Sequence, residues 1–194
     1  MGKAISLSSL FIIVSLSHIF ITGSCFCQSC PGMEIITDSR DGQIYSTVQI
    51  GSQCWLRRNM NFETDNSWCY DDVKQNCDIY GRLYDWQTAI GLCPAGWHLP
   101  SDDEWTILTA FLGGDSLAGG KMKEAGTVHW FSSCNYNNEN GFTALPGGYR
   151  LSNKIYSNIG TYVYFWTSTE MCYLGWQESL DKLKRLVEPN IPDA

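Results

Sequence analysis

The sequence is poor in basic residues and contains no extended basic cluster. Its 194 residues include 13 lysines and arginines against 20 aspartates and glutamates, which gives a formal net charge of −7. Nucleic acids and anionic lipid surfaces are bound mainly through clusters of lysine and arginine. We therefore expect no nucleic-acid partner, and no membrane contact through the protein surface itself.

The chain also lacks the motifs of common catalytic and metal sites. Apart from one histidine in the apolar N-terminal segment, only His98 and His129 are present. A zinc site built on Cys27 and Cys30 would need a second ligand pair at suitable spacing, and no G-x-S-x-G motif occurs. The stretch GDSLAGGK at 114–121 has neither the spacing nor the Ser or Thr of a phosphate loop. We expect no catalytic residue, metal or cofactor.

Two groups of acidic residues invite a calcium interpretation, which we do not favour. One follows His98 in CPAGWHLPSDDEWTIL at 93–108, and the other (Asp71, Asp72, Asn76 and Asp78) reads as a solvated loop. Adjacent carboxylates in the first turn of a helix do not converge on one point, whereas calcium takes six to eight oxygens. Ser101 and Glu104 instead predict a capping box that begins a helix, and we assign His98 a structural role.

The N-terminus predicts export. An apolar run at 10–21 follows Lys3 and is too short to span a membrane, so residues 1–24 are interpreted as a signal peptide. Thr22 to Cys25 approximates a bacterial lipobox without its usual leucine. Lipid attachment at Cys25 and simple cleavage both stay open, and an anchored chain would meet the membrane only through that lipid. Either way, we predict an extracellular or cell-envelope location.

Nine cysteines in an exported chain favour disulfides over free thiols, because that compartment is oxidising. Cys69 and Cys77 flank a short acidic loop and predict a local disulfide. The further disulfide candidates are Cys93, Cys134 and Cys172.

Hydrophobic patterns predict an α+β domain after a leader at 25–37. Residues 41–60 predict a β-hairpin that turns at Gly51-Ser52. Residues 80–90 carry apolar residues at helical spacing, and a second helix follows Ser101. The segments 141–150 and 161–170 predict strands separated by long connections, an arrangement in which helices pack on an antiparallel sheet.

Four stretches resemble one known family. They are DGQIYSTVQIGSQCW, YGRLYDWQTAIGLCPAGWHLPSDDEW, GFTALPGGYR and FWTSTE, and over about residues 38–180 they resemble the Fibrobacter succinogenes major paralogous domain. That family occurs in exported bacterial proteins, often lipoproteins, and is similar in fold to C-type lectin-like domains and formylglycine-generating enzymes. The resemblance implies a C-type lectin-like fold, with two helices packed on a small antiparallel sheet and a long loop region. It implies no established activity.

The tail at 181–194 departs from the family pattern. The family's closing strand carries a cysteine that would pair with the equivalent of Cys93, and this strand is missing here. Leucines at helical spacing indicate a short amphipathic helix in its place. Two interpretations stay open: a truncated domain, or a rebuilt end in which Cys93 pairs elsewhere, for instance with Cys172.

The function that these observations favour is a non-enzymatic surface or secreted module that binds a glycan or a surface protein. Binding is expected through the aromatic and asparagine-rich region 130–166. The candidate ligand-surface residues are Trp130, Tyr136, Asn137, Asn138, Tyr149, Tyr156 and Trp166. The alternatives are a structural envelope lipoprotein without a small ligand and a formylglycine-generating-enzyme-like oxidase, which would need free reactive thiols. The sequence indicates no particular oligomeric state.

Overall fold

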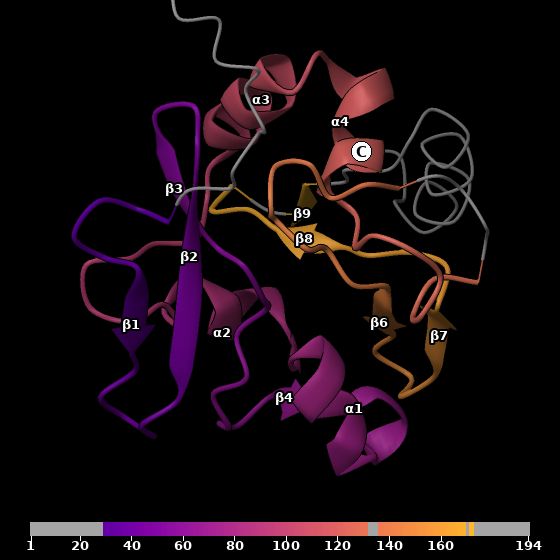
Figure 1. The fold of residues 1–194 in the computed structure, drawn as a ribbon. Coiled ribbons are helices and arrows are strands. Elements are labelled where there is room, and N and C mark those ends of the chain that lie inside the picture. The colour runs from indigo at the N-terminus through magenta and orange to yellow at the C-terminus, as the bar shows by residue number, and fades with distance from the viewer. Residues whose placement is uncertain (1–28, 132–135, 170, 173–194) are drawn as a thin grey trace, which may run out of the picture.

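The computed structural model describes residues 29–131, 136–169 and 171–172. The predicted signal peptide, Cys25, Cys134 and the tail at 181–194 lie outside these residues. Within them, the fold combines four α-helices with short antiparallel sheets, as Figure 1 shows, which confirms the α+β class. None of the helices in this part of the chain is both long and apolar enough to cross a membrane.

The N-terminal part is a three-stranded antiparallel sheet in the order β1-β2-β3. Its strands are β1 (Ile35–Thr37), β2 (Ile44–Ile50) and β3 (Gln53–Leu56). Ile50 lies opposite Gln53, so the hairpin turns through two residues as predicted, and Gly51 has a φ of 60°. A Cβ at Gly51 would lie 3.0 Å from the Phe111 ring, which gives this glycine a packing role as well.

The middle segment differs from its prediction. It contains β4 (Ser67–Trp68), a 3₁₀ helix η1 (Tyr70–Asp72), α1 (Lys74–Tyr80), β5 (Leu83–Tyr84) and α2 (Trp86–Ile90). The helix expected over 80–90 begins only at Trp86, because Asp85 caps it by accepting a hydrogen bond from the Thr88 amide. Leu83 lies in a strand and pairs with Trp68.

Two further helices cover the sheet. The α3 helix (Asp102–Phe111) begins at the predicted capping box: the Ser101 Oγ accepts from the Glu104 amide at 3.3 Å, and the Glu104 Oε2 accepts from the Ser101 amide at 2.8 Å. The α4 helix (Asp115–Met122) follows. The expected number of two helices is therefore wrong for the described part, because α1 and α4 form in addition.

The C-terminal part forms two hairpins. Strands β6 (Gly147–Arg150) and β7 (Tyr156–Ile159) pair antiparallel, and so do β8 (Phe165–Trp166) and β9 (Met171–Cys172). Strand β7 lies in the segment that we had read as a long connection. The hydrophobic core lies between the β2–β3 hairpin and the α3–α4 pair. Its buried members are Val48, Ile50, Trp55, Trp105, Leu108, Leu112, Ala118, Met122, Phe142 and Ala144.

Two disulfides reinforce this fold. The Cys69–Cys77 bond confirms the predicted local pair. The Cys30–Cys54 bond was not predicted and joins the leader to β3. Cys93 carries a free thiol, so its predicted pairing is not found in the described structure. Cys134 and the side chain of Cys172 lie outside the described residues.

Candidate functional site

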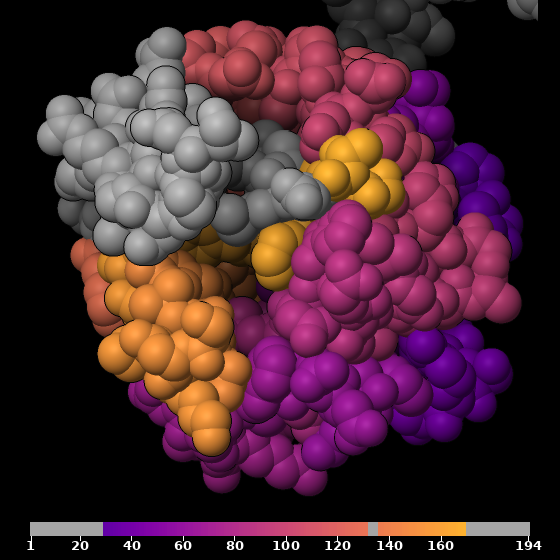
Figure 2. All heavy atoms as spheres, turned by 180° about the vertical axis from the view of Figure 1, so that it is seen from behind, coloured from indigo at the N-terminus to yellow at the C-terminus, as the bar shows by residue number. Residues whose placement is uncertain are grey.

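The β6–β7 hairpin carries aromatic and polar side chains on both of its faces. Arg150 lies opposite Tyr156 in the register, and Tyr149 lies opposite Ser157. Because side chains alternate along a strand, Arg150 and Tyr156 share one face and Tyr149 lies on the other. Seen from behind in Figure 2, the orange segment that contains the hairpin forms a ridge, and the surface is hollowed between this ridge and the magenta segments facing it.

The first face holds an arginine in contact with two aromatic rings. The guanidinium carbon of Arg150 lies 4.0 Å from the centroid of the Trp68 ring and 5.6 Å from that of Tyr156. The Tyr70 and Tyr156 rings are 5.3 Å apart. Strands β4, β6 and β7 thus each contribute one member of a ladder, Trp68–Arg150–Tyr156. Such cation–π contacts contribute about 0.5 to 1 kcal/mol each at exposed sites.

The Tyr156 hydroxyl is held in place at this ladder. It donates a hydrogen bond of 2.6 Å to the Asp72 Oδ1. Burial raises the pKa of Tyr156, the Asp72 hydrogen bond raises it further, and a hydrogen bond with Arg150 acts in the opposite direction. The phenol therefore stays a proton donor at neutral pH. Asp71 and Asp72 have positive φ angles of 54° and 56°, a conformation uncommon for residues other than glycine.

The second face is a cluster of tyrosines. Tyr149 meets Tyr164 edge-on with ring centroids 5.1 Å apart, and Tyr162 lies 6.2 Å from Tyr164. The Asn158 Nδ2 donates to the Tyr164 hydroxyl at 3.0 Å. Sequence reasoning did not single out Tyr162 and Tyr164, although their i, i+2 spacing in TYVY places both on one side of an extended segment. We refer to the Trp68–Arg150–Tyr156 ladder, Asp72 and this tyrosine cluster together as the hairpin surface.

Trp130 is a correction to the predicted ligand surface. Its side chain is only 2% exposed, and its Nε1 donates to the Ala144 carbonyl at 3.2 Å. The Lys123 ammonium also lies 4.2 Å from its ring centroid. Trp130 is therefore a core residue, and its ring cannot serve as a stacking platform for a ligand.

The other predicted residues divide between two places. Tyr149 and Tyr156 lie on the hairpin surface. Asn138 closes a separate loop by accepting from the Thr143 amide and donating to its hydroxyl, with Tyr136 and Asn137 preceding it. Trp166 is half-buried and donates its Nε1 to the Tyr84 carbonyl at 2.8 Å, which holds β8 against β5.

Asp102 and Glu104, in the first turn of α3, have intramolecular partners. Hydrogen bonds from Thr169 and Thr167 lower the pKa of Asp102. Burial acts to raise the pKa of Glu104, but hydrogen bonds from Ser101 and His98 outweigh it and the pKa is lowered. Residues 29–131 and 136–169 contain no group of three or more His, Cys, Asp or Glu side chains arranged to hold a metal ion.

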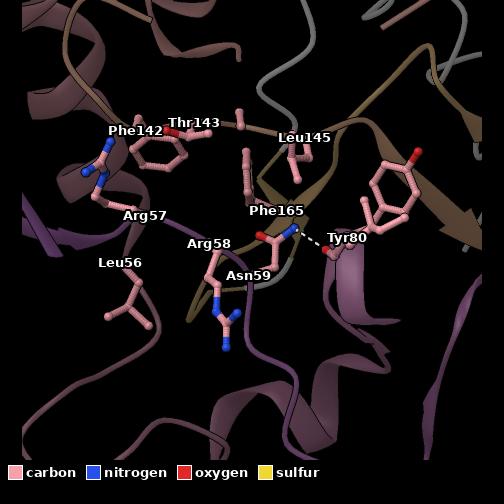
Figure 3. A pocket seen from close by; sticks show the side chains of 11 residues that line it. Leu56, Arg57, Arg58, Asn59, Tyr80, Phe142, Thr143, Leu145 and Phe165 are labelled. Carbon is pink, nitrogen blue, oxygen red and sulfur yellow. Dashed lines mark hydrogen bonds between the residues drawn. The ribbon is translucent and has the colours of Figure 1, made fainter. Parts of the chain in front are cut away.

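A small pocket lies elsewhere, between β3, α1 and the 142–145 segment, as Figure 3 shows. The Arg57 Nε donates to the Gly141 carbonyl, and the Asn59 Nδ2 donates to the Tyr80 carbonyl, each at 2.9 Å. The pocket has an interior volume of about 30 Å³, which is room for about two water molecules.

Comparisons with known proteins give one match. The sequence model described as the Fibrobacter succinogenes major domain matches residues 48–186. No curated protein and no solved structure matches the chain. The matched range includes every residue of the hairpin surface.

Proposed function

This chain belongs to the Fibrobacter succinogenes major domain family, and we propose that it is an exported, non-enzymatic module of the bacterial surface that binds a glycan. The observation that carries the proposal is the hairpin surface, where half-buried aromatic rings stand beside polar groups on a rigid β-hairpin. Tyrosine and tryptophan combine an apolar ring with a polar tip. They suit a sugar, which has an apolar ring face and hydroxyls at its edge.

Preorganisation of these rings supports the proposal. The Tyr156 hydroxyl is bonded to Asp72, and the Tyr164 hydroxyl is bonded to Asn158. A ring that is already fixed loses less conformational entropy when a ligand binds, and affinity rises accordingly. The same bonds aim carboxylate and amide groups at the edges of the rings, where sugar hydroxyls would lie.

Other features support export and the absence of catalysis. Two disulfides suit an oxidising compartment. The imidazoles of His98 and His129 each contact a carboxylate, of Glu104 and Glu124, at 2.8 Å. Glu104 in turn belongs to the capping box of α3, so His98 has a structural explanation.

Binding to glycan and protein panels tests the proposal, with the purified chain kept under oxidising conditions. We expect glycan binding that falls by about fivefold or more in Tyr149→Ala and in Tyr156→Ala, since a stacked aromatic ring contributes about 1 kcal/mol or more. Phe111→Ala is the matched control, because Phe111 is an aromatic residue on α3 that is 64% exposed. If the folded protein binds no glycan on the panel, the proposal is wrong. If it binds only proteins, its ligand is a protein and not a glycan.

A further inference from the structure

Arg150 differs from several other cations of the domain in having no carboxylate partner. Arg40, Arg82 and Lys121 each form an ion pair. Within the described part of the chain, Arg150 forms none, and its guanidinium contacts the rings of Trp68 and Tyr156. A half-buried guanidinium without a counter-charge is a suitable partner for an anionic ligand group.

The geometry around Arg150 also prepares it for such a ligand. The Trp68 ring, 4.0 Å away, holds the plane of the guanidinium and leaves its edge for hydrogen bonds. The Arg150 Nε is buried without a hydrogen-bond acceptor, so a ligand would meet the two terminal Nη groups instead. A planar guanidinium donates two parallel N–H bonds to a carboxylate, and an aromatic ring that fixes its plane reduces the entropy lost on binding.

We propose that the hairpin surface recognises an acidic saccharide, with Arg150 binding the carboxylate of a uronic acid residue. This inference rests on the proposed glycan binding and specifies its ligand class. The Asp72 carboxylate restricts which ligands fit, because it accepts a hydrogen bond from the Tyr156 hydroxyl and Arg150 contacts the ring of the same tyrosine. A second anionic group next to Asp72 would be repelled, whereas a sugar hydroxyl there can donate a hydrogen bond to the carboxylate.

Pairs of ligands that differ only in charge test the inference. Oligosaccharides of galacturonate, glucuronate and mannuronate are each compared with their methyl esters by isothermal titration calorimetry. We expect at least one acid to bind about tenfold or more tightly than its ester, because a hydrogen bond to a charged group is stronger than one to a neutral group. If glycans bind but no acid is preferred over its ester, the inference is wrong and the proposed glycan binding stands. If no glycan binds at all, both are wrong.

Two substitutions in the same hairpin locate the effect. Arg150→Gln removes the guanidinium, and Lys154→Gln removes the same charge from an exposed position in the β6–β7 connection. We expect Arg150→Gln to lower the affinity for the acid to that for the ester, and Lys154→Gln to leave the preference intact. Equal losses in the two variants would contradict a role for Arg150.

Arg150→Lys keeps the charge but loses the planar pair of donors, so it serves as a second variant if Arg150→Gln unfolds. It should bind the acid with intermediate affinity, and its fold is checked by thermal unfolding. If folded Arg150→Lys keeps the full preference for the acid, the positive charge alone is sufficient for recognition. The proposed bidentate hydrogen bond from Arg150 would then be wrong.

Discussion

Cys30 is joined by a disulfide to Cys54, 24 residues further along the chain. Cys30 is fully buried, and its amide donates to the Thr47 Oγ1 at 3.1 Å. The Thr47 hydroxyl in turn donates to the Met33 carbonyl at 2.6 Å. Residues 29–37 of the predicted leader are therefore packed against β2 and β3, and β1 (Ile35–Thr37) forms within them.

Removing this disulfide should destabilise the domain more than removing the local one. Loop-closure entropy predicts about 3.5 kcal/mol for a loop of the Cys30–Cys54 size and about 2.5 kcal/mol for that of Cys69–Cys77. We expect the double alanine variants to follow this order in urea unfolding under oxidising conditions. An equal or inverted order would mean that strain or residual structure in the unfolded chain outweighs loop length.

The Asp38–Arg40 pair should make stability sensitive to acid. Asp38 is 1% exposed and accepts from the Arg40 Nε at 2.9 Å and Nη2 at 2.6 Å. The Arg40 hydrogen bond lowers the pKa of Asp38 against the opposing effect of burial. A pKa lowered on folding gives stability that is fully present above the ordinary carboxyl pKa of about 4 and is lost as the pH falls through the lowered value.

Arg40→Met tests this pair, because it leaves a buried carboxylate without its partner. At pH 7 we expect a loss of roughly 2 kcal/mol, less than for a fully buried pair because the Arg40 side chain is 32% exposed. The variant should also lose less stability than the wild type between about pH 5 and pH 2.5. Parallel pH profiles of urea midpoints for the two proteins would contradict the assignment.

Local signals in the sequence were sufficient for some elements. Gly51 supplies the positive φ of a two-residue turn, and Ser101 with Glu104 supplies a complete capping box, so these elements depend on neighbours within a few residues. The α4 helix has a glycine-rich sequence of low helix propensity. It is accounted for by the burial of Ala118 and Met122 in the core, and no local pattern shows that burial.

The candidate site also depends on burial and contacts that local sequence patterns do not reveal. Tyr149 and Tyr156 were identified because aromatic residues concentrate after residue 130, but Trp130 belongs to the same concentration and is buried. Residue type does not distinguish a core ring from a surface ring. The sequence analysis missed Arg150 because its proposed role depends on its contact with the Trp68 ring. Trp68 lies in another strand, about 80 residues earlier in the chain.

Gly148 should be intolerant of any side chain. It has a φ of 64°, and a Cβ there would collide with the Ser157 carbonyl oxygen and lie 2.7 Å from the Ile159 amide. Both are backbone atoms of β7, so neither can move without breaking the hairpin. We expect Gly148→Ala to cost about 3 kcal/mol or more and to abolish ligand binding at the hairpin surface.

Gly42→Ala is the matched control for this substitution. Gly42 has a φ of 77°, and a Cβ there would meet no atom within 4 Å. It should cost only the left-handed strain of about 1 to 2 kcal/mol. Similar losses for the two alanine variants in chemical denaturation would show that the φ angle dominates and that the close approach of β7 contributes nothing.

The Cys93 thiol should be slow to react in the folded protein. Burial raises its pKa, and the nearby Arg40 charge opposes this only in part. Because the thiolate is the nucleophile, a raised pKa and restricted access both slow alkylation. We expect iodoacetamide at about pH 7.5 to label Cys93 at least roughly tenfold more slowly in the native than in the unfolded, unreduced protein. Peptide mapping by mass spectrometry identifies the labelled site, and Cys93→Ser should remove that label.

The same peptide map of labelled cysteines distinguishes three possible states of Cys93: bridged, free and reactive, or free and slow to react. A Cys93 that is unlabelled even after unfolding without reductant would be bridged to another cysteine, as the interpretation of a rebuilt C-terminal end implies, and would contradict the free thiol of the structure. Rapid labelling of native Cys93 would contradict the effect of burial, and it would also favour the oxidase alternative, which needs a reactive thiol. Slow native and fast unfolded labelling leaves Cys93 as a partly buried packing residue near Arg40. In that case the described residues are cross-linked by the bonds Cys30–Cys54 and Cys69–Cys77, and Cys93 contributes no cross-link to them.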